Sequence, residues 1–312
     1  MAHPRRFRFA AQFHTAQNAD AWAAKARKAE DLGYSTLLLP DHFGDQLAPV
    51  PAMMAAADAT TDLRVGVLVF DNDYKHPVVL AKEVATIDVL SGGRVEFGIG
   101  AGWMNTDYEQ SGIPQDPPGV RIDRMTEALA VIKGLWDDGP VSFEGRHYRI
   151  SGLEGLPKPV QRPHPPILIG GGGKRVLSLA AREADLVGIN PRLTSGAADA
   201  ESARDALASR TDTKVAWVRE AAGERFDDLE LNMLVFAVIV TDDRRAMLEM
   251  MAGATGLTPE EASDVPHAWI GTVEEICDQI VAARERWGVS YWIVQGDPFE
   301  AAAPVVAKLA GT

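Results

Sequence analysis

The dipeptide Asp41-His42 is the part of the sequence best suited to acid–base chemistry. Only Pro40 separates it from the stretch 35–39, which predicts a buried strand. Histidine is the side chain whose ordinary pKa lies nearest neutral pH, so it can both donate and accept a proton there. The alternative is a structural histidine that bonds a loop carbonyl. We predict His42 as the catalytic residue and Asp41 as a neighbour that contacts a cofactor.

Four consecutive glycines form a second candidate site. They lie between a strand predicted at 167–169 and a helix predicted at 175–184. Backbone amides without a Cβ can approach a phosphate closely, and a helix N-terminus favours its negative charge. A flexible turn is the alternative. We predict that this segment binds the phosphate of a cofactor through Gly170, Gly171, Gly172 and Gly173.

Other common catalytic patterns fit poorly or are missing. Gly98-x-Gly100-x-Gly102 has glycines spaced as in a dinucleotide fingerprint, but the polar segment 104–114 follows instead of a packed helix. We interpret these glycines as a close approach to a bound ring, with tight strand packing as the alternative. The histidines show no metal-ligand spacing, so no metal is expected. There is no Gly-x-Ser-x-Gly motif, and the single cysteine, Cys277, excludes an internal disulfide.

The composition predicts a folded protein with a full core. The chain has 312 residues, of which 46% are hydrophobic, so it can bury a full core. Its net charge of −13 argues against nucleic acid or an anionic membrane as a partner. Neither a signal peptide nor a membrane-spanning run is evident, and we expect a cytoplasmic location.

Short apolar strands alternate with amphipathic helices along the chain. Asn18 or Asp20, Pro77, and the pair Thr272 and Glu275 mark helix starts. This alternation predicts an α/β fold, a single (β/α)8 TIM barrel. We expect one domain over 1–312, with insertions near 104–118, 138–165 and 192–228. The strands are predicted at 7–13, 35–39, 64–70, 94–99, 167–169, 185–189, 229–240 and 290–294.

In such a barrel the active site lies at the C-terminal ends of the strands. The residues there are therefore the candidates for contact with a cofactor. Besides His42 and the glycine-rich segment, we predict cofactor contacts for Gln12, Asp41, Val69, Phe70, Gly102 and Asn105.

The chain resembles the luciferase-like flavin monooxygenase superfamily over nearly its whole length. It is most similar to the subfamily that uses the deazaflavin coenzyme F420. The resemblance is carried by AEDLGYSTLLLPDHF (29–43), HPVVLAKEVATIDVLSGGRVEFGIGAGW (76–103), PKPVQRPHPPILIGGGGKRVLSLAAREAD (157–185) and GTVEEICDQIVAARERWGVSYWIV (271–294).

The resemblance implies roles for three of the candidate positions. It puts His42 beside the reactive ring as the group that transfers a proton. It puts Val69 at a bulge in strand three, where deazaflavin members carry a non-proline cis peptide against the ring. It puts the glycines after strand five at the coenzyme phosphate, and it implies a homodimer.

One departure from the family pattern concerns the substrate. Some sugar-phosphate dehydrogenases of this group carry a glutamate acid after strand four, where this sequence has Trp103. That disfavours a sugar phosphate and favours an uncharged or aromatic substrate. Three functions stay open: an F420-dependent oxidoreductase, an FMN-dependent monooxygenase, and a flavin-binding protein without turnover.

Overall fold

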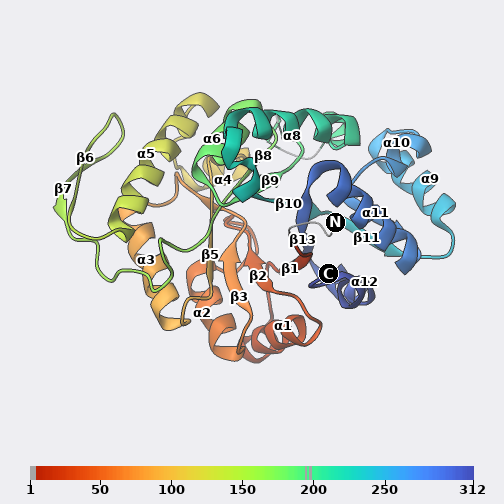
Figure 1. Cartoon of the computed structure of the whole chain (residues 1–312), viewed down its shortest axis with the longest axis horizontal. Coiled ribbons are helices and arrows are strands. Elements are labelled where there is room, and N and C mark those ends of the chain that lie inside the picture. The colour runs from red at the N-terminus through yellow and green to blue at the C-terminus, as the bar shows by residue number, and fades with distance from the viewer. Residues whose placement is uncertain (1–4, 194, 197–198) are drawn as a thin grey trace.

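Parallel strands close into a barrel in the computed structural model, which describes residues 5–193, 195–196 and 199–312. Neighbouring strands follow the order β3-β2-β1-β13-β10-β9-β8-β5, and β3 pairs with β5 to close the ring. This confirms the predicted (β/α)8 barrel (Figure 1). Its eight strands in the described chain are β1 (Arg8–Gln12), β2 (Thr36–Leu39), β3 (Arg64–Val67), β5 (Val95–Gly100), β8 (Ile167–Gly171), β9 (Leu186–Ile189), β10 (Glu230–Val235) and β13 (Val289–Gln295).

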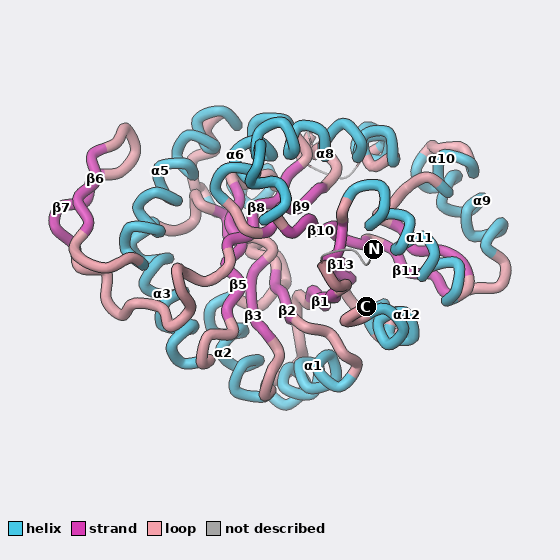
Figure 2. Tube along the Cα trace, viewed as in Figure 1, coloured by secondary structure: helices cyan, strands magenta, loops and turns pink. Residues whose placement is uncertain are grey.

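Helices surround this barrel on the outside (Figure 2). Three predicted helix starts are confirmed: Asn18 caps the first helix, Pro77 begins another, and Thr272 forms a capping box with Glu275. Sequence analysis missed the helix 49–59, whose N-cap Ala48 offers no side-chain hydrogen bond. The covering helices are α1 (Ala19–Asp31), α2 (Pro49–Ala59), α3 (Pro77–Leu90), α5 (Pro118–Trp136), α6 (Lys174–Glu183), α8 (Ala208–Ala222), α11 (Val273–Trp287) and α12 (Ala303–Leu309).

Two predicted strands are interrupted. Strand three stops at Val67, passes through a cis peptide bond between Leu68 and Val69, and resumes as β4 (Phe70–Asp71) beside β5. The continuous strand 229–240 is wrong, because the chain breaks at Phe236. Its second part, β11 (Ala237–Val240), pairs in parallel with β12 (Ala268–Gly271), a strand that sequence analysis missed.

The remaining elements lie in the loops. Residues 105–111 form a short helix within the segment 104–114 that sequence analysis described as polar. Asp243 caps the helix after β11. None of the described helices is long and apolar enough to span a membrane. The loop elements are α4 (Asn105–Ser111), the hairpin β6 (Val141–Glu144) and β7 (Arg149–Leu153), α7 (Ala200–Asp205), η1 (Gly223–Asp228), α9 (Arg244–Thr255), α10 (Pro259–Ser263) and η2 (Asp297–Phe299). The one-domain division stays a prediction.

A buried carboxylate holds the N-terminal end of the barrel together. Glu96 on β5 accepts hydrogen bonds from Arg64 Nε at 3.0 Å and from the Tyr291 hydroxyl at 3.0 Å, and it pairs with Arg8. Burial opposes its ionisation, but the guanidinium groups of Arg8 and Arg64 outweigh that effect and lower the pKa of Glu96. One side chain therefore connects β1, β3, β5 and β13.

We expect Glu96→Ala to lower the free energy of unfolding by about 3–5 kcal/mol, because it removes the buried carboxylate that pairs with the partly buried Arg8 and Arg64 and accepts from Tyr291. Urea titration monitored by circular dichroism measures this. The matched control is Glu144→Ala, which removes an exposed ion pair with Arg149 in the β6–β7 hairpin and should cost less than about 0.5 kcal/mol. Equal losses in both variants would contradict the role of Glu96.

The same carboxylate predicts how stability depends on pH. Folding lowers the pKa of Glu96. Its contribution to the free energy of unfolding is therefore fully present above the pKa that it has in the unfolded chain, and it is lost as pH falls through the pKa that it has in the folded protein. Wild-type stability should therefore fall more steeply in acid than that of Glu96→Gln. Parallel acid limbs in urea titrations of the two proteins would contradict this.

Candidate active site

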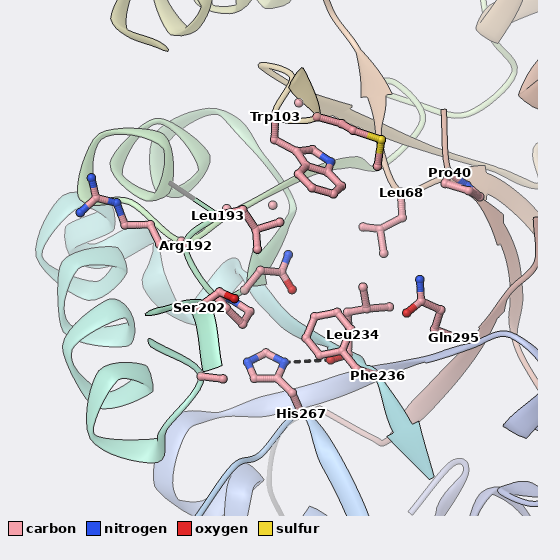
Figure 3. A pocket seen from close by; sticks show the side chains of 18 of the residues that line it. Pro40, Leu68, Trp103, Arg192, Leu193, Ser202, Leu234, Phe236, His267 and Gln295 are labelled. Atoms are coloured by element: carbon pink, nitrogen blue, oxygen red, sulfur yellow. Dashed lines mark hydrogen bonds between the residues drawn. The ribbon is translucent and has the colours of Figure 1, made fainter. Parts of the chain in front are cut away.

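A cavity of about 1120 Å³ opens at the C-terminal end of the barrel (Figure 3). Residues that follow β1, β2, β3, β5, β8 and β9 form one part of its wall, and residues between α7 and β12 form another. Of the residues predicted for the site, those that line the cavity are Gln12, Asp41, His42, Val69, Gly102, Gly170, Gly171 and Gly172.

His42 is held by a carboxylate from a distant loop. Its Nδ1 lies 2.6 Å from Asp107 Oδ2 on α4. Asp107 also accepts from the Tyr74 hydroxyl at 2.9 Å and from the Phe43 amide at 3.3 Å. An ionised carboxylate can only accept a hydrogen bond, so Nδ1 carries the proton of the neutral ring. Nε2 is then the ring nitrogen that can take up or release a proton. The ring also packs edge-on against Trp103, with 5.4 Å between centroids.

Two further carboxyls, those of Asp41 and Asp71, lie at the same end of the barrel as His42 and Asp107. Asp41 accepts a hydrogen bond from the Asp71 amide, and Asp71 Oδ2 accepts from the Tyr108 hydroxyl at 3.0 Å. Burial raises the pKa of both carboxyls, that of Asp71 to about 6. Gly102 has a φ of +73°, and a Cβ there would lie 1.8 Å from the Tyr108 hydroxyl oxygen. This position therefore requires glycine for two reasons.

The cis peptide bond between Leu68 and Val69 lies in the cavity wall. Gln12, which is 2% exposed at the end of β1, donates from Nε2 to the Leu68 carbonyl at 3.1 Å. This contact determines the orientation of the amide, and Oε1 is left buried without a partner among the described residues. Asn190 also lines the cavity, and its buried Oδ1 likewise has no hydrogen-bond partner among the described residues.

The glycine-rich segment joins β8 to α6, as predicted. Close packing already surrounds two of its members. A Cβ on Gly171 would lie 2.3 Å from Val176 Cγ1, and one on Gly172 would lie 2.6 Å from the Arg192 amide nitrogen. Gly173, the N-cap of α6, is more open, with Arg192 Nε about 4.0 Å from the position of a Cβ. A guanidinium therefore lies beside the N-terminus of a ten-residue helix.

Three predicted residues lie outside the set that lines the cavity. Phe70 is 1% exposed and packs in the core against Phe97. Asn105 begins α4 and bonds the Ser195 carbonyl and Gln115. Gly173 adjoins the wall without lining it. For Phe70 the cause is the interrupted strand, because the break at 68–69 changes which side chains face the barrel interior.

Sequence analysis also missed residues that the fold brings to the cavity. Asp107 lies 65 positions from its partner His42, and no spacing rule connects them. Arg192, Phe236 and His267 come from loops for which no motif was recognised. Trp103 was noted only as a departure from a family pattern, although its place after strand four could have marked it as part of the wall.

Relatives of this chain use different cofactors. It is 28% identical over 303 residues to an F420-dependent glucose-6-phosphate dehydrogenase of Nakamurella multipartita, covering 93% of this chain and 82% of the relative. It is 34% identical over 127 residues to an FMNH(2)-dependent dimethylsulfone monooxygenase of Pseudomonas putida, covering 41% of this chain and 35% of the relative. The chain spans 65% of the length of uncharacterized mycobacterial proteins that it matches at 32% identity.

Solved structures show the same fold. The coenzyme F420-dependent tetrahydromethanopterin reductase of Methanopyrus kandleri superposes with a TM-score of 0.76 at 18% identity, covering 98% of this chain and 99% of that one. The sequence model of one family, described as luciferase-like monooxygenase, matches residues 5–287, which is most of the chain. The protein therefore belongs to the luciferase-like monooxygenase family.

Proposed function

We propose that this protein is an F420-dependent oxidoreductase that acts on a small organic substrate. The observation that carries the proposal is that one cavity is lined both by His42, which bonds Asp107, and by the wall that contains Leu68–Val69 and Gln12. The F420-dependent relative also matches over 93% of this chain, whereas the FMN-dependent one matches over 41%. A cytoplasmic location and a homodimer stay predictions.

The residues of the cavity fit a ring coenzyme that carries a phosphate. The buried Oε1 of Gln12 and Oδ1 of Asn190 need donors, and the pyrimidine portion of a flavin or deazaflavin carries N–H groups. The N-terminus of α6 and Arg192 offer positive potential for a phosphate. Lys174 and Arg175 point elsewhere, because they pair with Glu220 and Asp123.

The coenzyme, when bound, supplies the two-electron redox chemistry. The protein contributes orientation and a proton. Asp107 holds the His42 ring in one tautomer, so that Nε2 is the atom that accepts a proton from the substrate or returns one to it. Trp103 packs edge-on against the same ring. Asp107 is thus a positioning residue, and His42 is the catalytic residue.

An FMN-dependent monooxygenase is the alternative, supported by the dimethylsulfone monooxygenase relative. Fluorescence titration of the purified protein with F420 and, separately, with FMN distinguishes the two. We expect a dissociation constant for F420 at least about tenfold below that for FMN. Tight FMN binding without F420 binding would contradict the proposal. A protein that binds F420 but never oxidises its reduced form with enones or quinones would be a binder without turnover.

We expect His42→Ala to lower turnover by roughly 10²–10⁴-fold, because it removes the proton-transferring group. The dissociation constant of the coenzyme should change much less, since phosphate contacts are untouched. His42→Gln, which keeps a hydrogen-bonding side chain, should be equally slow, and the pH–rate profile should lose one limb. Stopped-flow oxidation of the reduced coenzyme measures both effects after melting curves establish that the variants are folded.

Asp107→Asn tests the positioning role. It should slow turnover in the wild-type background and have little further effect in the His42→Ala background, because Asp107 acts through the histidine. Additive losses in the double variant would mean that Asp107 acts independently.

For the His42→Ala prediction, near-normal turnover in a folded variant would mean that His42 is only a packing residue.

Arg192→Gln should weaken coenzyme binding by about tenfold through loss of a charged contact to the phosphate. The matched control is Arg182→Gln, an exposed position in the last turn of the same helix α6. Titration of both variants with the coenzyme and with its dephosphorylated, ring-only analogue measures this. Equal affinities for wild type and Arg192→Gln would argue that Arg192 does not contact the phosphate. Substitutions of Gly171 or Gly172 are less informative because a Cβ there collides with the protein itself.

A further inference from the structure

The cavity has a second part whose wall differs from the acidic wall around His42. It is formed by α7, α9 and the segment that leads into β12, and we call it the apolar chamber. Several of its residues belong to a hydrophobic cluster separate from the main barrel core. The apolar side chains that line it are Ala203, Ala206, Phe236, Met251, Leu257 and Val265.

The polar side chains of this chamber are nearly all satisfied within the protein. Asp199 accepts hydrogen bonds from the Ser202 amide and from the Ser195 hydroxyl. The Ser202 hydroxyl donates to the Asp199 carbonyl, and the Thr255 hydroxyl donates to the Met251 carbonyl at 2.7 Å. A ligand that enters the chamber therefore gains little from these groups.

His267 is different. Its Nδ1 donates to the Leu234 carbonyl at 2.8 Å, which determines the tautomer and leaves Nε2 with a lone pair (Figure 3). Nε2 has no partner within the part of the chain that the structure describes. Burial lowers the pKa of His267 to about 4, so the ring is neutral at pH 7.

The orientation of His267 is fixed from two sides. The Phe236 ring lies 5.5 Å from the imidazole centroid, tilted by 31°. The Phe236 amide also donates to the His267 carbonyl at 2.9 Å. Phe236 itself lies where strand seven breaks, so the break that sequence analysis missed is what brings these two rings together. A neutral acceptor in an apolar chamber selects for a single donor and against charge.

We propose that the apolar chamber binds an uncharged, largely apolar or aromatic substrate whose hydroxyl or N–H group donates to Nε2 of His267. This inference rests on the proposed function, because it assigns the substrate class of the same site. It also makes anionic substrates unfavourable, since the chamber side chains named above are apolar, and the guanidinium of the cavity wall, Arg192, lies beside Gly173 at the proposed phosphate site.

Binding to the coenzyme-free protein tests the chamber separately from the redox activity. Equilibrium dialysis is carried out with 2-naphthol, 2-methoxynaphthalene and 2-naphthoate, which share a ring system and differ in the donor and the charge. We expect 2-naphthol to bind about fivefold to tenfold more tightly than the methoxy compound, and 2-naphthoate more weakly than either. Binding of 2-naphthoate as tight as that of 2-naphthol would overturn the proposal.

His267→Phe removes the acceptor and keeps a ring of similar size. The preference for 2-naphthol over 2-methoxynaphthalene should disappear, while binding of the methoxy compound stays within about twofold. A folded variant that retains the preference would overturn the role of His267.

A second pair of variants keeps the proposal testable if His267→Phe does not fold. Met251→Lys places a cation in the chamber and should make 2-naphthoate the preferred ligand. Met250→Lys is its matched control, because Met250 is 56% exposed and does not line the cavity. Unchanged ligand preference in Met251→Lys would overturn the chamber as the binding site. If the protein shows the proposed ligand selectivity but does not bind F420, the proposal for the chamber stands and only the proposed function is rejected.

Discussion

Closure of the sheet between β3 and β5 is the constraint on which the rest of the structure depends. The two strands are in register only at Val65 with Val95 and Gly66 with Glu96. They approach so closely that a Cβ on Gly98 would lie 1.9 Å from the Val67 carbonyl oxygen. Glu96 is in this seam, and its bonds to Arg8, Arg64 and Tyr291 connect it to β1, β3 and β13. Buried charge thus occupies the N-terminal end of the barrel, and the opposite rim is free for chemistry.

The interrupted third strand links that seam to the candidate active site. Directly after the paired residues, the chain leaves the regular ladder through the Leu68–Val69 peptide and rejoins β5 two residues later. Gln12 lies at the end of β1, which β2 separates from β3 in the sheet, and it donates to the Leu68 carbonyl. The wall of the cavity is therefore backbone held by neighbouring strands, and a rigid wall of this kind positions a flat ligand better than a free loop does.

Charge and apolar surface are divided between the two parts of the cavity. Around His42, the carboxyls of Asp41, Asp71 and Asp107 accept hydrogen bonds from backbone amides and tyrosine hydroxyls. In the apolar chamber, helices α7 and α9 contribute mainly small and apolar side chains. Such a division suits a reaction in which a proton is transferred at one end of the cavity and the apolar part of a ligand binds at the other.

Sequence alone determined the barrel and much of its rim. The hydrophobic periodicity of strands and helices depends on residues that are close along the chain, and so do the helix starts at Asn18, Pro77 and Thr272. The rule that active sites follow barrel strands led to the prediction of His42, Gln12 and Gly170–Gly172, and these residues line the cavity. It failed for Phe70, because the break before it changes the side-chain alternation that the rule assumes.

Only the tertiary structure decided which distant groups meet. The bond between His42 and Asp107, the position of Arg192 beside Gly173, and the entry of His267 into the cavity join segments far apart in the chain. Such contacts depend on how loops pack over the rim. Local periodicity carries no information about that packing, because loop conformation is set by non-local contacts and not by the repeat of strand and helix.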